Sequence, residues 1–84
     1  MQLRGLKPNT IVIYVRTQKF YRISRVGVDL DNSVSFVTAV DAEGTAITIN
    51  RYQNPGDGTY HPRDFKRTSI RPEDLWKLNW HWRK

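Results

Sequence analysis

The sequence predicts a mainly β domain, a small barrel of about five antiparallel strands followed by a short C-terminal helical turn. Two observations carry this prediction. Residues 10–50 contain four short runs of β-branched and aromatic residues, which fit a pleated, half-buried surface, and turn-forming residues separate the runs. A helix-start pattern, Arg-Pro-Glu-Asp-Leu, comes late, at 71–75. There proline suits the first helical position and the two carboxylates suit the positive end of a helix.

The first two strands are expected over 10–16 and 19–28. Residues 11–15 read Ile-Val-Ile-Tyr-Val, so both faces of the first strand are apolar and we expect it to be central or covered at one end. In the second strand the apolar residues switch from odd to even positions after Ile23. Such a change of phase predicts a β-bulge, which bends a strand sharply.

The third and fourth strands are expected over 34–40 and 45–50, joined by the turn Asp-Ala-Glu-Gly. In the third strand the even-numbered residues form one largely apolar face, and we expect Phe36 of that face to belong to the core. In the fourth strand Ile47 and Ile49 are expected to point inward.

The segment 51–69 departs from this alternation. Its prolines and glycines break the backbone repeatedly, and so long a loop is uncommon in a compact domain. We expect a short edge strand to form within 65–70. Leucines of the helical turn are expected to pack beneath the barrel, and Leu3 and Leu6 of the N-terminal lead-in to cap one end.

The length and composition limit the class of protein. Eighty-four residues predict a single domain, with the barrel over about 6–78 and a basic, aromatic tail over 79–84. The chain has no cysteine, which excludes a disulfide framework and a cysteine zinc site. No other metal-ligand spacing and no glycine-rich phosphate loop is present, so no metal or cofactor is expected. A membrane-spanning run and a signal-peptide core are also missing from the sequence, which predicts a cytoplasmic protein without membrane contact.

The net charge of +6 is unevenly distributed along the chain. Residues 1–28 carry six bases and no acid, residues 29–50 carry four acids and no base, and residues 51–84 carry eight bases and four acids. If strands from the two ends of the chain lie together in a closed sheet, one pole is positive and the opposite pole negative. Such a field attracts and orients polyanions, which predicts a polyanion as partner. The plainer alternative is that the bases only keep a small domain soluble.

The order of the elements resembles that of SH3-like small barrels. Four closely spaced strands, a bulged second strand, a broken loop and the final turn Ile-Arg-Pro-Glu-Asp-Leu (70–75) follow that pattern. The stretch Leu-Lys-Pro-Asn-Thr (6–10) is similar to the turn that opens KOW- and Tudor-type barrels. The first strand lacks the glycine that follows it in a KOW motif, and the aromatic cage of Tudor domains cannot be assigned residue by residue. The resemblance covers about residues 6–78 and implies a fold often used to bind nucleic acid or peptides.

Aromatic residues interleave with basic ones, and this combination predicts a nucleic-acid-binding surface. Cations neutralise phosphates and release counterions, while aromatic rings stack on bases. We therefore predict a non-catalytic protein that binds DNA or RNA with its early hairpin and its late irregular segment. The predicted surface comprises Arg16, Lys19, Arg22, Arg25, Arg51, Tyr60, Arg63, Lys66 and Arg67.

The C-terminal tail supports an alternative from a different class. All three tryptophans fall within 76–82, two bases follow them, and tryptophan and arginine are enriched at the centres of protein–protein interfaces. In this alternative the chain is a bacterial or bacteriophage accessory protein that binds and modulates a partner protein. The contact residues are then Trp80, Trp82, Arg83 and Lys84.

A third alternative is a toxin-like protein that cleaves RNA. His61 with Asp57 or Asp64 then supplies the general acid and base. Proline follows His61 directly and no family motif surrounds it, so we expect the protein not to be an enzyme and assign no catalytic residue.

Overall fold

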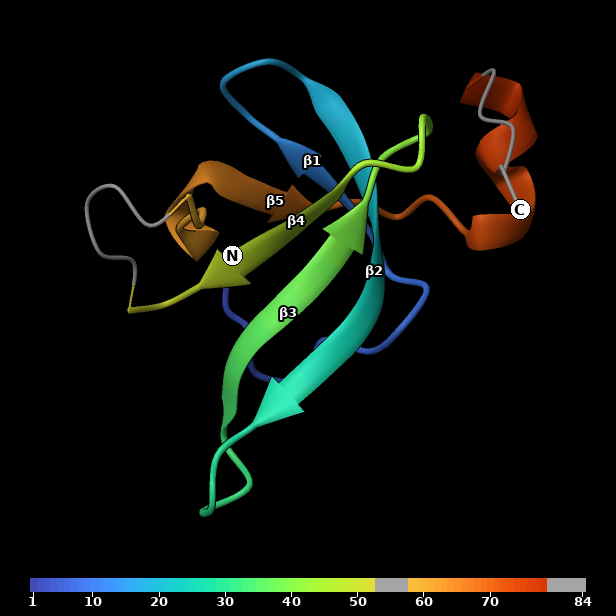
Figure 1. The fold of residues 1–84 in the computed structure, drawn as a ribbon. Helices are drawn as coiled ribbons and strands as arrows, with labels where there is room; N and C mark the ends of the chain where they lie inside the picture. Colours follow the sequence, from blue (N-terminus) through green and yellow to red (C-terminus); the bar gives the residue numbers. More distant parts are fainter. Residues whose placement is uncertain (53–57, 79–84) are drawn as a thin grey trace.

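A computed structural model describes residues 1–52 and 58–78 of the chain (Figure 1). They form one five-stranded antiparallel sheet and two 3₁₀ turns, which confirms the predicted mainly β class and the C-terminal turn. The elements are β1 (Ile11–Tyr14), β2 (Lys19–Val28), β3 (Val34–Val40), β4 (Ala46–Asn50), η1 (Pro62–Asp64), β5 (Phe65–Arg67) and η2 (Pro72–Leu78). No helix in this part of the chain is long and apolar enough to cross a membrane.

The sheet has the strand order β4-β3-β2-β1-β5, so three hairpins connect neighbours and β5 returns to the free side of β1. The segment before β5 also touches the opposite end of the sheet. Tyr60 donates its N–H to the Thr48 carbonyl (2.9 Å) and accepts the Asn50 N–H (2.8 Å), which forms an isolated parallel bridge with Ile49. The sheet therefore curls until its two ends approach each other. Since no ladder joins β4 to β5 in residues 1–52 and 58–78, full closure into a barrel stays a prediction.

The strand β2 is long and bent, as the change of phase in its sequence predicts (Figure 1). Its register with β3 shifts between Ile23 and Arg25 and again between Gly27 and Val28. Before the first shift Ile23 is fully buried, and after it Val26 packs against the same core. The bulge thus keeps apolar side chains on the inner face while the strand bends.

The main core lies inside the curled sheet. Its fully buried residues are Val12, Ile23, Val37, Ala39, Ile49 and Phe65. Leu3 and Leu6 of the lead-in pack onto this core, as predicted. A second, smaller cluster forms on the other face of β1, where Leu75 of η2 packs against Ile11. Both faces of β1 are therefore covered, which confirms the prediction from its continuous apolar run.

The strand β3 buries the face opposite to the predicted one. Val37 and Ala39 are fully buried, whereas Phe36 is half-buried on the outer face. Its ring lies over Gly27 of β2, where an added Cβ would be 2.1 Å from Phe36 Cε1. The prediction that Phe36 belongs to the core is therefore wrong. β3 carries apolar residues on both faces. The face that is buried is the one on which Val37 pairs with Ile49 of β4.

Candidate nucleic-acid interface

Basic side chains gather where β5 forms one end of the sheet. Phe65 is fully buried and anchors the strand in the core, and the two residues that follow it, Lys66 and Arg67, are exposed. In the register with β1, Lys66 lies opposite Ile13 and Arg67 lies opposite Val12. Neighbouring residues of a strand point to opposite faces, so these two cations leave β5 on opposite sides.

The turn η1 adds Arg63 to this group. His61 caps the turn, since its Nδ1 accepts the N–H of Arg63 at 3.1 Å, and Pro62 occupies the first helical position and is buried. With the turn anchored in this way, the side chain of Arg63 is exposed immediately before β5.

Two further arginines reach the same edge from distant parts of the chain. Arg67 donates from Nη2 to the carbonyl oxygen of Arg4 (2.9 Å), and Arg16 Nε lies 3.3 Å from Oδ1 of Asp64. The side chain of Arg16 is 66% exposed, and pairs this open to solvent contribute little energy, so its guanidinium stays available to an anion. We call the following residues the basic edge: Arg4, Arg16, Arg63, Lys66 and Arg67. Among the described residues, Asp64 is the one carboxylate that is ion-paired with this group.

Lys19, which belongs to the predicted surface, is held by a buried carboxylate. Its Nζ lies 2.8 Å from Oδ2 of Asp41, whose side chain is 1% exposed. Oδ1 of Asp41 accepts the N–H groups of Glu43 and Thr45, both at 2.9 Å. Burial is the largest single influence on the pKa of Asp41 and acts to raise it, but Lys19 and the two N–H groups together outweigh burial and lower that pKa. The hydrogen bond to Asp41 in turn raises the pKa of Lys19, so this lysine ties the first hairpin to the β3–β4 turn.

Arg22 and Arg25 lie on β2, across β1 from the basic edge. Arg22 pairs with Ile11 in the register and donates to Oδ1 of Asn9 (2.8 Å), and Arg25 is exposed. Because Leu75 packs on Ile11, η2 rests on the strand that separates these two arginines from the basic edge. The structure therefore divides the predicted surface into two groups and does not form a single platform.

The acidic residues are divided as well. Asp29 and Asp31 precede β3 while Asp41 and Glu43 follow it, so the two pairs are separated by the length of the strand, about 20 Å. The first pair lies near Arg51, whose Nη2 is 3.8 Å from Oδ2 of Asp29. The four acidic residues therefore lie in two pairs at the two ends of β3, and each pair lies beside a different basic residue.

The aromatic residues of the predicted surface also differ in their environment. Tyr60 is packed: its ring meets Tyr14 edge-on with centroids 5.3 Å apart and meets Phe65 at 6.0 Å. Tyr52, which the predicted surface omits, is 62% exposed, and the Arg51 guanidinium lies 4.7 Å from its ring centroid. The adjacent Arg-Tyr pair at 51–52 is the sequence signal that could have indicated it.

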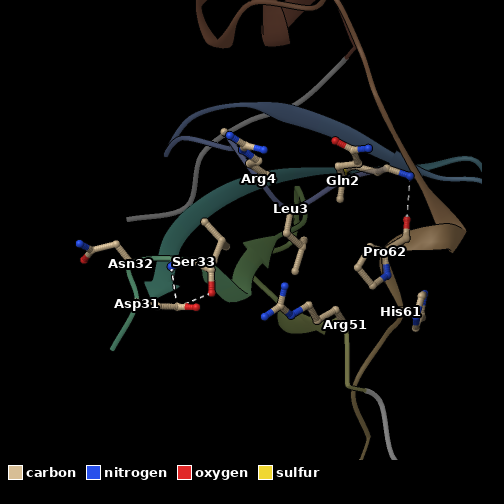
Figure 2. Close-up of a pocket in the computed structure, with 12 residues that line it drawn as sticks. Gln2, Leu3, Arg4, Asp31, Asn32, Ser33, Arg51, His61 and Pro62 are labelled. Carbon is tan, nitrogen blue, oxygen red and sulfur yellow. Dashed lines mark hydrogen bonds between the residues drawn. The ribbon is translucent and has the colours of Figure 1, made fainter. Parts of the chain in front are cut away.

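A pocket of about 710 Å³ adjoins the basic edge. Four segments that are distant in the chain line it, namely 1–5, 31–34, Arg51 and 61–62. Figure 2 shows Arg4 and Arg51 on opposite sides of Leu3. Asp31 accepts hydrogen bonds from the N–H (3.1 Å) and the hydroxyl (2.6 Å) of Ser33. Local sequence patterns cannot indicate such a pocket, because it exists only when these segments meet.

Some predicted residues lie outside the described part of the chain. They are Asp57, Trp80, Trp82, Arg83 and Lys84. Within residues 1–52 and 58–78, no group of three or more histidine, aspartate or glutamate side chains could hold a metal ion.

Comparisons of the chain with models of known protein families, with curated proteins and with solved structures gave no match.

Proposed function

We propose that this chain is a small, non-catalytic nucleic-acid-binding protein that contacts the phosphate backbone through its basic edge. One observation carries the proposal. Five cations from three separated segments lie at the β5 edge of the sheet, and among the described residues a single carboxylate is ion-paired with them. Positive charge concentrated in this way is the electrostatic footprint of nucleic-acid-binding modules, and the net charge of +6 has the sign that attracts a polyanion.

The geometry of the edge suits backbone contacts better than base readout. Lys66 and Arg67 leave β5 on opposite sides, and Arg63 lies in the turn before β5. A nucleic-acid strand that runs beside β5 therefore meets cations along its path. Contacts of this kind position a nucleic acid without reading its sequence, and we therefore expect modest sequence preference. Since Tyr60 is packed against Phe65, base stacking contributes less at this edge than its sequence position suggests.

Fluorescence anisotropy with labelled single-stranded and duplex oligonucleotides tests the proposal. We expect a dissociation constant of roughly micromolar or below at about 50 mM salt, and much weaker binding at about 200 mM. The double variant Arg63→Gln, Lys66→Gln should reduce the slope of log affinity against log salt for a single strand by about 1.4, because each lost phosphate contact removes about 0.7.

A matched control removes two charges from elsewhere. The control is the double variant Arg25→Gln, Arg71→Gln. Arg25 lies across β1 from the basic edge, and Arg71 lies beside η2, where it already pairs with Glu73 and Asp74. If this control loses as much affinity as the edge variant, binding is diffuse and the basic edge is rejected. The absence of binding at low salt rejects the function itself.

The two alternatives stay predictions with tests of their own. Removing residues 79–84 distinguishes the accessory protein, since loss of partner pull-down with unchanged oligonucleotide affinity favours it. The RNA-cleaving alternative requires a catalytic His61, whose Nδ1 accepts the N–H of Arg63. RNA cleavage by the wild type that His61→Ala abolishes would support this alternative.

A further inference from the structure

We propose that the pocket beside the basic edge binds one nucleotide, unstacked from a single strand whose backbone lies on that edge. This inference rests on the proposed function and names the substrate class, which is single-stranded nucleic acid. The pocket volume of about 710 Å³ falls within the roughly 300–1,000 Å³ of small-ligand sites, which is room for one nucleotide. A base paired and stacked inside a duplex cannot enter such a site without being extruded.

The basic edge leads directly to the pocket. Arg4 belongs to both, because its carbonyl accepts the guanidinium of Arg67 and the residue also lines the pocket. His61 and Pro62 form another part of the lining, and Arg63 of the basic edge follows them in the chain. A backbone held by Arg63 and Arg67 is therefore close to the pocket on two sides.

The charges of the lining favour an anion. Arg4 and Arg51 contribute two guanidinium groups, which can bind phosphate oxygens through paired hydrogen bonds, and Asp31 is the one lining carboxylate. Asp31 is already engaged by the N–H and hydroxyl of Ser33. The contact of Arg51 with Asp29 is long, at 3.8 Å, and both side chains are more than a third exposed, so a phosphate can replace that carboxylate at little cost.

The remaining lining suits a nucleobase. Met1 and Val34 are half-buried and supply apolar surface, and the carboxamides of Gln2 and Asn32 are exposed and carry both donors and an acceptor for a base edge. Tyr52 is next in the chain to a lining arginine and is 62% exposed, so its ring can stack with a neighbouring base. This set of groups recognises a base and a phosphate together, which distinguishes a nucleotide from a simple anion.

NMR titration of the wild type with 5′-AMP, adenosine and inorganic phosphate tests the pocket directly. We expect 5′-AMP to shift the backbone amides of Leu3, Asn32 and Ser33 in a saturable way, and adenosine and phosphate to bind more weakly. Arg51→Gln should weaken the binding of 5′-AMP by about tenfold or more, because it removes one charged hydrogen-bonding group. Arg4→Gln serves as a second variant, since its carbonyl keeps the bond to Arg67. Arg71→Gln, which lies outside the lining, is the control and should change nothing.

Binding of single-stranded and duplex oligonucleotides to the same variants tests this inference separately from the proposed function. Arg51→Gln should weaken a single strand and leave a duplex unchanged, whereas Lys66→Gln should weaken both. If 5′-AMP shifts no pocket amide, or Arg51→Gln binds it like the wild type, the pocket inference is overturned. A continuing effect of Lys66→Gln then still supports the proposed function. Phosphate binding as tightly as 5′-AMP overturns recognition of the base. If no oligonucleotide binds at low salt, the proposed function and the single-strand inference both fail, even where 5′-AMP fills the pocket.

Discussion

Replacing Asp41 is the sharpest test of how the charges of this protein are used. Its carboxylate is 1% exposed, accepts the N–H groups of Glu43 and Thr45 at 2.9 Å, and lies 2.8 Å from Lys19 Nζ. Asp41→Ala removes the acceptor and leaves both N–H groups without it. Asp41→Asn keeps a side chain of the same size and one carbonyl oxygen for the N–H groups, but it removes the charge that faces Lys19.

The contacts set the size of the expected effect. Each hydrogen bond to a charged acceptor contributes about 1.5–3 kcal/mol, so two sum to about 3–6 kcal/mol. Glu43 and Thr45 are exposed, so water can bind their N–H groups when the carboxylate is removed. Asp41→Ala should therefore lower the free energy of unfolding by about 3 kcal/mol, the low end of this range. The Lys19 side chain is 46% exposed, so its ion pair adds at most about 1 kcal/mol. A domain of 84 residues has about 4–13 kcal/mol in total, and the melting temperature should fall by about 12 °C or more.

The pH dependence supplies a second readout. The pKa of Asp41 is lower in the folded chain than the ordinary 3.8, so its contribution is fully present above that value and is lost as the pH falls through the folded pKa. The stability difference between the wild type and Asp41→Asn should therefore be constant near neutral pH and shrink below about pH 4. The pKa of Lys19 is raised above 10.5, so its share of the stability is present below 10.5 and is lost as the pH rises through the folded pKa.

Thermal and urea unfolding followed by circular dichroism measure these differences. Glu43→Gln is the matched control, since it removes an exposed carboxylate from the same turn and should change stability by less than about 0.5 kcal/mol. A melting temperature for Asp41→Ala within two or three degrees of the wild type, about 0.5 kcal/mol, would refute the structural role of this carboxylate. So would an Asp41→Asn difference that does not change between neutral and acidic pH.

Three further substitutions test the packing that positions the site. Gly27→Ala places a Cβ 2.1 Å from Phe36 Cε1 and should cost about 1–3 kcal/mol in urea unfolding, a loss that Phe36→Leu in the same chain should partly reverse. Leu75→Ala should cost about 2–3 kcal/mol, because Leu75 is 1% exposed against Ile11, and an unchanged urea midpoint would contradict the packing of η2 on β1. His61→Ala removes the cap of η1 and should lower stability by about 1 kcal/mol, whereas His61→Asn, which keeps a capping acceptor, should lose less.

Local sequence patterns predicted much of the fold. The β-branched runs and turns located all four strands of residues 10–50, and the change of phase after Ile23 predicted the bulge in β2. The sequence patterns failed for Phe36. Alternation of side chains assigns residues to two faces of a strand but does not determine which face is buried. That choice depends on the partner strands: Val37 lies opposite Ile49, and the core forms on their side.

The candidate site was less predictable than the fold. Arg16, Arg63, Lys66 and Arg67 were predicted as surface cations, and the pairing of β1 with β5 brings them to one edge. Arg4 was missed, since its place depends on a hydrogen bond to a residue 63 positions later. The pocket was missed for the same reason, because its lining comes from four separated segments.

By itself, the sequence determined the class of fold, the position of its strands and the sign of its charge, because turn chemistry, side-chain periodicity and composition are local properties of a chain. The tertiary structure alone decided which cations an anion can reach. Lys19 and Lys66 are the same residue type on neighbouring parts of one sheet, yet a buried carboxylate holds Lys19, while Lys66 is exposed without an ion pair among the described residues. Coulomb interactions between side chains act over a few ångströms at full strength, so the outcome depends on which distant segments the fold brings within that range.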